Sequence, residues 1–283
     1  MIFKTIPLSE TARLDAYIQD PAITFQTYID RPALIICPGG AYLIHATKEA
    51  EPVALHFLAH GFNTFVLRYS VATDREHPEK GVNTDLRYPQ PSVELLEAIH
   101  LIRTNAKEWH VKPDSIYLAG FSAGAHVAAT AGLRWNDPSL TDQLSFIPEG
   151  GELRTCGMVL GYPMLADNPE DFCSNVPAEN TNLVRNVLYG TSSPSKQQIE
   201  SVDLKNFIEP ETAVPAFIWH SIDDPVVDST KSLEFIKAMK QKGIVCEYHL
   251  FSHGGHGLGL AGEDSALRLW PDLAHEWMKS LEE

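Results

Sequence analysis

The sequence predicts an α/β protein with a mostly parallel sheet covered by helices on both faces. Short apolar runs rich in β-branched residues alternate with segments of helical periodicity along most of the chain. Strands that alternate with helices pair in parallel, because each helix carries the chain back to the same edge of the sheet. The 283 residues, 44% hydrophobic and 21% charged, suit one large domain with a sizeable core, so we expect residues 1–283 to form a single domain.

Eight strands are expected in this twisted sheet, each from a short apolar run. The first two, at about 2–7 and 12–18, are expected to be antiparallel. The other six are expected at 33–37, 63–69, 115–119, 158–162, 216–219 and 245–251.

Helices are expected between these strands. Residues 47–60 and 92–108 have apolar side chains at helical spacing with charges between them. A helix rich in small residues follows Gly124, and two more are expected at 229–242, closed by Gly243, and at 265–282.

Two stretches, about 134–155 and 164–212, interrupt the alternation of strands and helices. The second is much longer than an ordinary connection and contains helical pieces near 181–189 and 195–207. We therefore expect residues 164–212 to be an insertion that forms a small lid over the functional site.

Composition restricts the partners. The formal net charge of −15 disfavours polyanionic nucleic acid and anionic membrane surfaces, so neither is expected as a partner. No uncharged apolar run reaches the roughly 18 residues of a spanning helix, and the first residues lack the pattern of a signal peptide. We expect a cytoplasmic protein, and a homo-oligomer is compatible with the sequence.

The most informative motif is Gly120-Phe121-Ser122-Ala123-Gly124, between a strand-like run and the small-residue helix. A strand, a sharp Gly-x-Ser-x-Gly turn and a helix are the context of a nucleophile elbow, in which a strained turn exposes the serine hydroxyl. A tight turn whose serine merely caps the helix is the alternative interpretation.

A serine hydroxyl needs a base to take its proton and a carboxylate to orient that base. In an open parallel sheet, ligands bind at the carboxyl ends of the strands, so these partners should directly follow strands. The segments 220–227 and 253–257 do so, and they supply an aspartate and then a histidine after Ser122. This chain order, Ser, Asp, His, is the one expected when the elbow belongs to such a sheet.

Each segment offers two candidates. Asp224 is the expected acid because an apolar Pro-Val-Val follows it directly, and Asp223 is the alternative, otherwise a turn or capping residue. His256, between glycines, is the expected base, and His253 is expected to support it through a hydrogen bond. The remaining histidines near these segments, His220, His249 and His126, are expected to be structural.

An acyl-transfer site also needs backbone N–H donors for the oxyanion of the tetrahedral intermediate. One donor is expected from Ala123, directly after the nucleophile. The other is expected from the glycine-rich turn Pro38-Gly39-Gly40-Ala41-Tyr42, with Gly40 and Ala41 as candidates. An ordinary Pro-Gly-Gly turn is the alternative interpretation.

Together, Gly-Phe-Ser-Ala-Gly, Pro-Gly-Gly-Ala-Tyr, His-Ser-Ile-Asp-Asp-Pro-Val-Val and Gly-Gly-His-Gly-Leu resemble the α/β-hydrolase superfamily. Within it, residues 30–283 resemble the acetyl-xylan and feruloyl esterase-like branch, also labelled sugar hydrolase or lipase/esterase. The resemblance implies the α/β-hydrolase fold, Ser122 as nucleophile, Asp224 as acid, His256 as base, and an oxyanion hole at Gly39, Gly40 and Ala41. This chain has Cys37-Pro38 where many relatives have His-Gly, and Glu94 where relatives often have Asp.

We therefore expect a serine esterase acting on small, soluble carboxylic esters, with no metal and no organic cofactor. Acetylated sugars or xylo-oligosaccharides are the substrates that the resemblance implies. Tyr42 and the insertion are expected either to shape the pocket or, with equal weight, to serve only in packing. Three alternatives stay open: a serine exopeptidase of the same fold, a non-catalytic small-molecule receptor, and a metal site. The last would use five residues: His220, Asp223, Asp224, His253 and His256.

Overall fold

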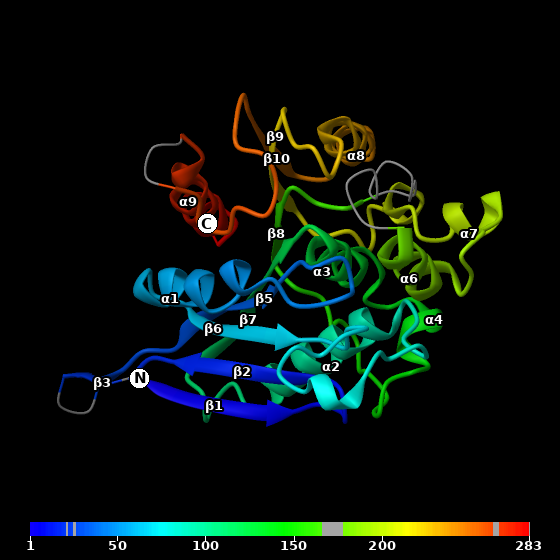
Figure 1. The fold of residues 1–283 in the computed structure, drawn as a ribbon. Helices are drawn as coiled ribbons and strands as arrows, with labels where there is room; N and C mark the ends of the chain where they lie inside the picture. Colours follow the sequence, from blue (N-terminus) through cyan, green and yellow to red (C-terminus); the bar gives the residue numbers. More distant parts are fainter. Residues whose placement is uncertain (21, 25–26, 166–177, 263–265, 283) are drawn as a thin grey trace.

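The computed structural model describes residues 1–20, 22–24, 27–165, 178–262 and 266–282. An eight-stranded sheet runs through the molecule in the order β1-β2-β6-β5-β7-β8-β9-β10 (Figure 1). β1 and β2, and β2 and β6, are antiparallel, and every other neighbouring pair is parallel. The strands are Ile2–Pro7 (β1), Arg13–Ile18 (β2), Arg31–Cys37 (β5), Asn63–Arg68 (β6), Val111–Phe121 (β7), Gly157–Gly161 (β8), Ala216–Ser221 (β9) and Cys246–Phe251 (β10).

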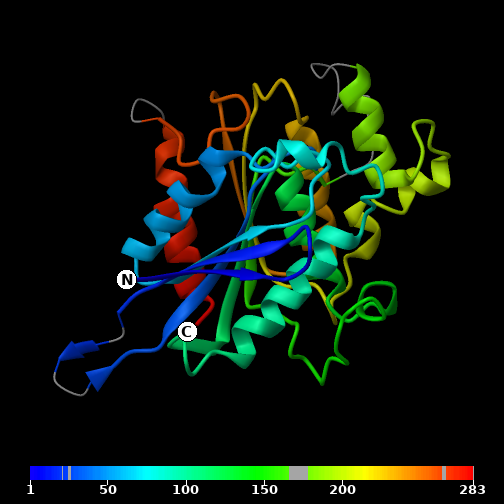
Figure 2. The same ribbon diagram turned by 60° about the horizontal axis from the view of Figure 1, so that its bottom comes forward.

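Helices cover both faces of this sheet (Figure 2). One face carries α1 and α9, and the other carries α2, α3 and α8. Their bounds are Glu51–Ala59 (α1), Gln90–Thr104 (α2), Ala123–Arg134 (α3), Ser229–Gln241 (α8) and Trp270–Ser280 (α9). The other described helices are Pro138–Thr141 (α4), Ala178–Tyr189 (α6) and Lys196–Glu200 (α7), with 3-10 turns at Thr47–Glu49, Pro78–Lys80, Leu204–Phe207 and Ala266–Leu269. Among the described helices, none has the length and apolar character needed to cross a bilayer.

Alternate side chains of β5 pack into two separate hydrophobic cores, one on each face of the sheet. Leu34 and Ile36 pack on the side of α1 and α9, whereas Ala33 and Ile35 pack on the side of α2, α3 and α8. All four are fully buried, because parallel strands covered on both faces have no solvent side. Packing on both faces therefore fixes the ends of the central strands relative to one another.

The predicted α/β architecture and the eight main strands are confirmed. The sequence analysis missed a small hairpin, Ala22–Thr24 (β3) with Thr27–Tyr28 (β4), because strands this short carry no hydrophobic periodicity. The expected helix at 47–60 is a 3-10 turn followed by α1, whose first turn contains Pro52. The expected helix at 92–108 begins at Gln90 and ends at Thr104.

Glu94 anchors α2 to the chain after β6, although relatives often carry an aspartate there. Its carboxylate accepts hydrogen bonds from the backbone N–H of Ser70, at 2.7 Å, and from Nε2 of Gln90, at 3.0 Å. It also bonds the Ser70 hydroxyl. The longer side chain thus satisfies the buried polar groups at this helix end.

Phe57 is the largest of the four buried side chains through which α1 packs on the sheet. It is fully buried and its ring lies 5.9 Å from that of Trp270 on α9. Phe57→Ala should lower the free energy of unfolding by about 3–5 kcal/mol, because it removes buried apolar area and leaves a cavity. Leu55→Ala, on the exposed side of the same helix, should cost at most about 1 kcal/mol. Urea unfolding of both variants measures the difference, and equal losses would contradict the packing described.

Candidate active site

Ser122 stands at the sharp turn between β7 and α3. Its backbone angles, φ 51° and ψ −119°, are rare for a residue with a side chain and cost about 1–3 kcal/mol. Two backbone hydrogen bonds hold the turn: the Ser122 N–H donates to the Gly161 carbonyl, and the Ser122 carbonyl accepts from the Met164 N–H, both at 3.1 Å. The surrounding structure thus enforces a conformation that lifts the hydroxyl out of the turn.

The two glycines of the motif are required by close backbone contacts. A Cβ on Gly124 would lie 2.1 Å from the carbonyl oxygen of Cys37, and one on Gly120 would lie 2.5 Å from the carbonyl oxygen of Gly124. Only glycine allows α3 to start this close to the end of β5. The loop after β5 consequently lies directly beside Ser122.

A chain of hydrogen bonds joins Ser122, His256 and Asp224. Oγ of Ser122 lies 2.9 Å from Nε2 of His256, and Nδ1 of His256 lies 2.7 Å from Oδ2 of Asp224. Because the carboxylate can only accept, Nδ1 carries the proton and the lone pair of Nε2 faces the Ser122 hydroxyl. The three side chains come from the ends of β7, β10 and β9, at the edge of the sheet where the sequence analysis expected them.

Asp223 and His253, the alternative acid and base, lie outside this chain of bonds. Nδ1 of His253 lies 3.4 Å from Oδ2 of Asp223, and the His253 side chain is 88% exposed. The second carboxylate oxygen of Asp223 accepts the backbone N–H of Gly255, at 3.0 Å. Asp223 therefore fixes the turn that carries His256.

The side chain of Asp224 is completely buried and surrounded by donors. Oδ1 accepts the backbone N–H groups of Val226, at 2.8 Å, and Val227, at 3.0 Å. Oδ2 is bonded by His256 and also by His220, at 3.1 Å. Burial favours the neutral acid, but the hydrogen bonds from His220 and His256 outweigh it and hold the pKa of Asp224 well below its usual range.

His220 was expected to be structural, yet it contacts the carboxylate at the centre of the site. Its Nε2 lies 3.1 Å from both Oδ2 of Asp224 and the carbonyl oxygen of Val227, two acceptors, so Nε2 carries a proton. Nδ1 lies 2.9 Å from the hydroxyl of Ser232 on α8. The signal that could have found it is its place at the end of β9, four residues before Asp224.

The loop after β5 supplies backbone donors beside Ser122. Gly40 and Ala41 line the same cavity as Ser122 and His256. Within the described part of the chain, nothing accepts a hydrogen bond from the N–H of Ala41 or of Ala123. The N–H of Ala123 is also one of the unpaired donors at the start of α3, where the helix dipole favours negative charge.

Tyr42 does not line this cavity, contrary to the expectation that it shapes the substrate pocket. It is fully buried, and its hydroxyl lies 2.7 Å from Nδ1 of His126 on α3. Nε2 of His126 in turn lies 3.0 Å from the carbonyl oxygen of Val202, and burial lowers the pKa of His126 to about 4. Tyr42 therefore anchors the Gly40–Ala41 turn to α3 through its contact with His126, and its own backbone has a positive φ of 61°.

The cavity above Ser122 has a volume of about 500 Å³ and a mixed lining. Part of its wall comes from the predicted insertion, because α6 contributes Asn180 and Leu183. Residues 166–177 of that insertion lie outside the described residues. The remaining lining groups are apolar or polar side chains around Ser122 and His256: Leu43, Ile44, Ala46, Glu49, Thr73, Arg75 and Val226.

Glu49 and Tyr162 form a polar bridge that the sequence analysis missed. Glu49 accepts the backbone N–H of Gly39, at 2.7 Å, and the hydroxyl of Tyr162, at 2.6 Å. The Tyr162 hydroxyl also accepts the N–H of Gly259, at 3.1 Å, and its ring lies 4.7 Å from that of His256. Burial raises the pKa of Glu49, although the bonds from Tyr162 and Gly39 oppose this. Tyr162 follows β8 directly, so the rule applied to the other strand ends could have found it.

The strained strand–turn–helix at Ser122, on a mostly parallel eight-stranded sheet, defines the α/β-hydrolase fold. Residues 22–239 match the family model described as BD-FAE, and the chain belongs to that family.

Solved structures and curated relatives agree with this assignment. The carboxylesterase Cest-2923 from Lactobacillus plantarum superposes with a TM-score of 0.79, 28% identity and coverage of 99% of this chain and 98% of that one. The acetyl ester-xyloside bifunctional hydrolase from Caldicellulosiruptor lactoaceticus gives a TM-score of 0.75 and 29% identity over 99% and 96%. The acetylxylan esterase of Xylanibacter ruminicola is 23% identical over 88% of this chain and 45% of its own length. The chain spans only 34% to 51% of the length of the curated relatives that it matches.

Because His220 contacts the buried carboxylate of Asp224, we expect the loss of stability in His220→Phe to depend on pH. In His220→Phe, the buried carboxylate loses a donor, which should lower the free energy of unfolding at pH 7 by roughly 1–3 kcal/mol. Since the folded-state pKa of Asp224 lies below its unfolded value, the stabilisation from its charged form is present above about pH 4 and is lost as the pH falls through the folded-state pKa. The deficit of the variant should therefore shrink in acid.

Urea unfolding at pH 7 and at acid pH measures this deficit. His249→Phe is the matched control, because Nε2 of His249 contacts the carboxylate of Glu247 on the same strand, at 2.6 Å, and not Asp224. A deficit that is the same at both pH values would contradict the assigned contact.

Proposed function

We propose that this protein is a carboxylic-ester hydrolase that works through an acyl-enzyme on Ser122. The observation that carries the proposal is the chain of hydrogen bonds from Ser122 through His256 to Asp224, beside two backbone N–H groups without an acceptor among the described residues. In this arrangement a hydroxyl, a base and a buried carboxylate stand in the order that nucleophilic acyl transfer requires.

In the first half of the reaction, Oγ of Ser122 attacks the ester carbonyl carbon while Nε2 of His256 takes the hydroxyl proton. The new C–O bond pushes the carbonyl electrons onto the oxygen, and the N–H groups of Ala123 and of Gly40 or Ala41 stabilise that oxyanion. The intermediate then collapses: the bond to the alcohol breaks, and His256 gives its proton to the departing alcohol oxygen. The acyl group stays on Ser122.

In the second half, a water molecule attacks the acyl-enzyme and His256 takes one of its protons. A second tetrahedral intermediate forms, and its collapse returns a proton from His256 to Oγ of Ser122 and releases the carboxylic acid. Asp224 stays ionised throughout and stabilises the imidazolium that forms twice in each cycle. The chain, the ester and water supply every proton and electron pair in these steps.

Short acyl groups on sugars are the proposed substrates. Two similar proteins, an acetyl ester-xyloside bifunctional hydrolase and an acetylxylan esterase, support this class. A cavity of about 500 Å³ has room for an acetyl group and part of a sugar, and Asn180, Thr73 and Arg75 offer polar groups to hydroxyls. The net charge of −15 disfavours polyanionic substrates.

Removing the nucleophile should abolish turnover without disturbing the fold. Ser122→Ala should lower kcat for a short-chain p-nitrophenyl ester by roughly 10⁶-fold, and Asp224→Asn should lower it by roughly 10⁴-fold because His256 then adopts the wrong tautomer. Steady-state kinetics measure both, with circular dichroism to confirm folding. Unchanged turnover in Ser122→Ala would reject the mechanism, and it would favour a non-catalytic receptor whose apparent turnover comes from a contaminant.

The leaving group distinguishes an esterase from an exopeptidase. We expect hydrolysis of p-nitrophenyl acetate and release of acetate from acetylated xylo-oligosaccharides, and no cleavage of aminoacyl p-nitroanilides. Chromogenic assays with both substrate types, and acetate quantification for the sugars, test this in parallel. Anilide cleavage without ester cleavage would replace the esterase proposal with a peptidase.

A further inference from the structure

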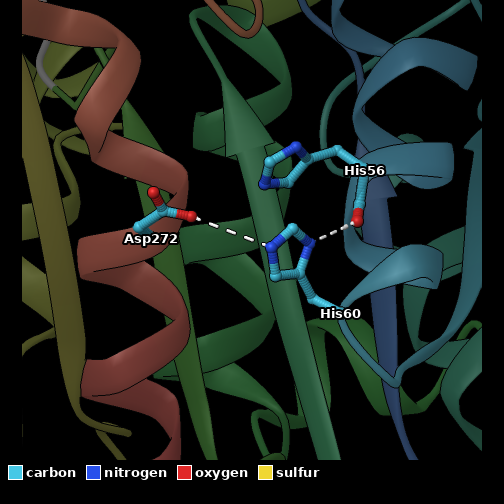
Figure 3. Close-up of side chains that lie close together, drawn as sticks. All are labelled: His56, His60 and Asp272. Atoms are coloured by element: carbon cyan, nitrogen blue, oxygen red, sulfur yellow. Dashed lines mark hydrogen bonds and ion pairs between the residues drawn. The ribbon is translucent and has the colours of Figure 1, made fainter.

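Two histidines and an aspartate meet on the surface between α1 and α9, away from Ser122 (Figure 3). His56 and His60 are four residues apart on α1 and so share one face of that helix, and Asp272 lies in the first turn of α9. One potential ligand atom from each residue lies within 4.8 Å of the others. Figure 3 shows a ring nitrogen of each histidine directed toward the carboxylate.

The orientation of His60 leaves a lone pair facing a carboxylate. Nδ1 of His60 lies 2.8 Å from the backbone carbonyl oxygen of His56, so Nδ1 carries a proton and donates it. Nε2 is then an acceptor in the neutral ring, and it lies 3.8 Å from Oδ1 of Asp272. These two acceptors face each other across a gap that a metal ion or a water molecule can bridge.

The neighbouring rings place a second imidazole beside the pair formed by His60 and Asp272. The ring centroids of His56 and His60 are stacked 4.4 Å apart, and the ring centroid of His275 lies 5.5 Å from that of His60. One divalent ion can accept a ligand atom from each of His56, His60 and Asp272 at once.

Packing beside the cluster holds the two helices together without any ion. The Phe57 ring on α1 lies 5.9 Å from that of Trp270 on α9, and the Phe62 ring lies 5.8 Å from that of His275. The ligands are therefore positioned by contacts independent of a metal, with their ligand atoms within 4.8 Å of one another. A backbone carbonyl that orients a ligating histidine through its other nitrogen is a recurring feature of metal sites.

We propose that His56, His60 and Asp272 bind a zinc ion that fastens α1 to α9, with water in the fourth position. Two imidazoles and a carboxylate are ligands that zinc accepts in tetrahedral geometry, and imidazole ligands do not suit magnesium. α1 follows the segment with Glu49, and α9 follows the His256 loop in the chain. The ion would thus tie together the two parts of the chain that the Glu49–Tyr162 bridge joins inside. It takes no part in the ester chemistry.

Titration of the purified, metal-stripped full chain with ZnCl₂ tests this site, by isothermal calorimetry and by thermal unfolding. We expect one ion per chain, and a rise in Tm of about 5 °C at a hundredfold excess over Kd, because zinc binds the folded state. MgCl₂ should give neither effect. His60→Ala and Asp272→Asn should each weaken zinc binding by roughly tenfold or more and abolish the rise in Tm.

His77→Ala is the matched control, because His77 also pairs with a single carboxylate on the surface, that of Glu79, but has no second histidine in the pair. It should bind zinc as the wild type does. Zinc affinity unchanged in both His60→Ala and Asp272→Asn would place the ion elsewhere and overturn the proposal, and so would the absence of binding to the wild type. Because these readouts are affinity and Tm, they are independent of whether the esterase proposal holds.

Discussion

A buried carboxylate that stays charged is the constraint on which the rest of the site depends. The carboxylate of Asp224 has no exposed surface, so its charge is tolerated only because two backbone N–H groups and two imidazoles donate to it. These donors fix both oxygens, which in turn fix the ring of His256 and direct its lone pair at Ser122. His220, tied to α8 through Ser232, makes this arrangement part of the core rather than of a surface loop.

Two other sets of hydrogen bonds hold the parts of the site in position relative to one another. The strained backbone of Ser122 is held by hydrogen bonds to the ends of β8 and the loop beyond it, so the turn cannot relax alone. Glu49 and Tyr162 join the turn at Gly39 to the segment after His256, through the N–H groups of Gly39 and Gly259. The proposed oxyanion donors and the proposed base are thus linked by one buried network.

The sequence predicted the sheet and the meeting of Ser122, Asp224 and His256, because apolar periodicity and strand-end position are local signals. It did not predict the roles of His220 and Glu49 in the site, since their contacts depend on side chains brought together from distant segments. For Tyr42 the sequence left a pocket role and plain packing equally open, and the buried contact of its hydroxyl with His126 on α3 favours packing. The lid over 164–212 remains a prediction, although α6 does contribute to the cavity wall.

A covalent label on a single residue tests the central proposal most directly. The protein would be treated with a fluorophosphonate probe, and its intact mass and its proteolytic fragments would be measured. The account predicts one adduct per chain, mapped to Ser122, that fails to form after heat denaturation or in His256→Ala. An adduct on another residue, or no adduct on a folded chain that hydrolyses esters, would contradict the account.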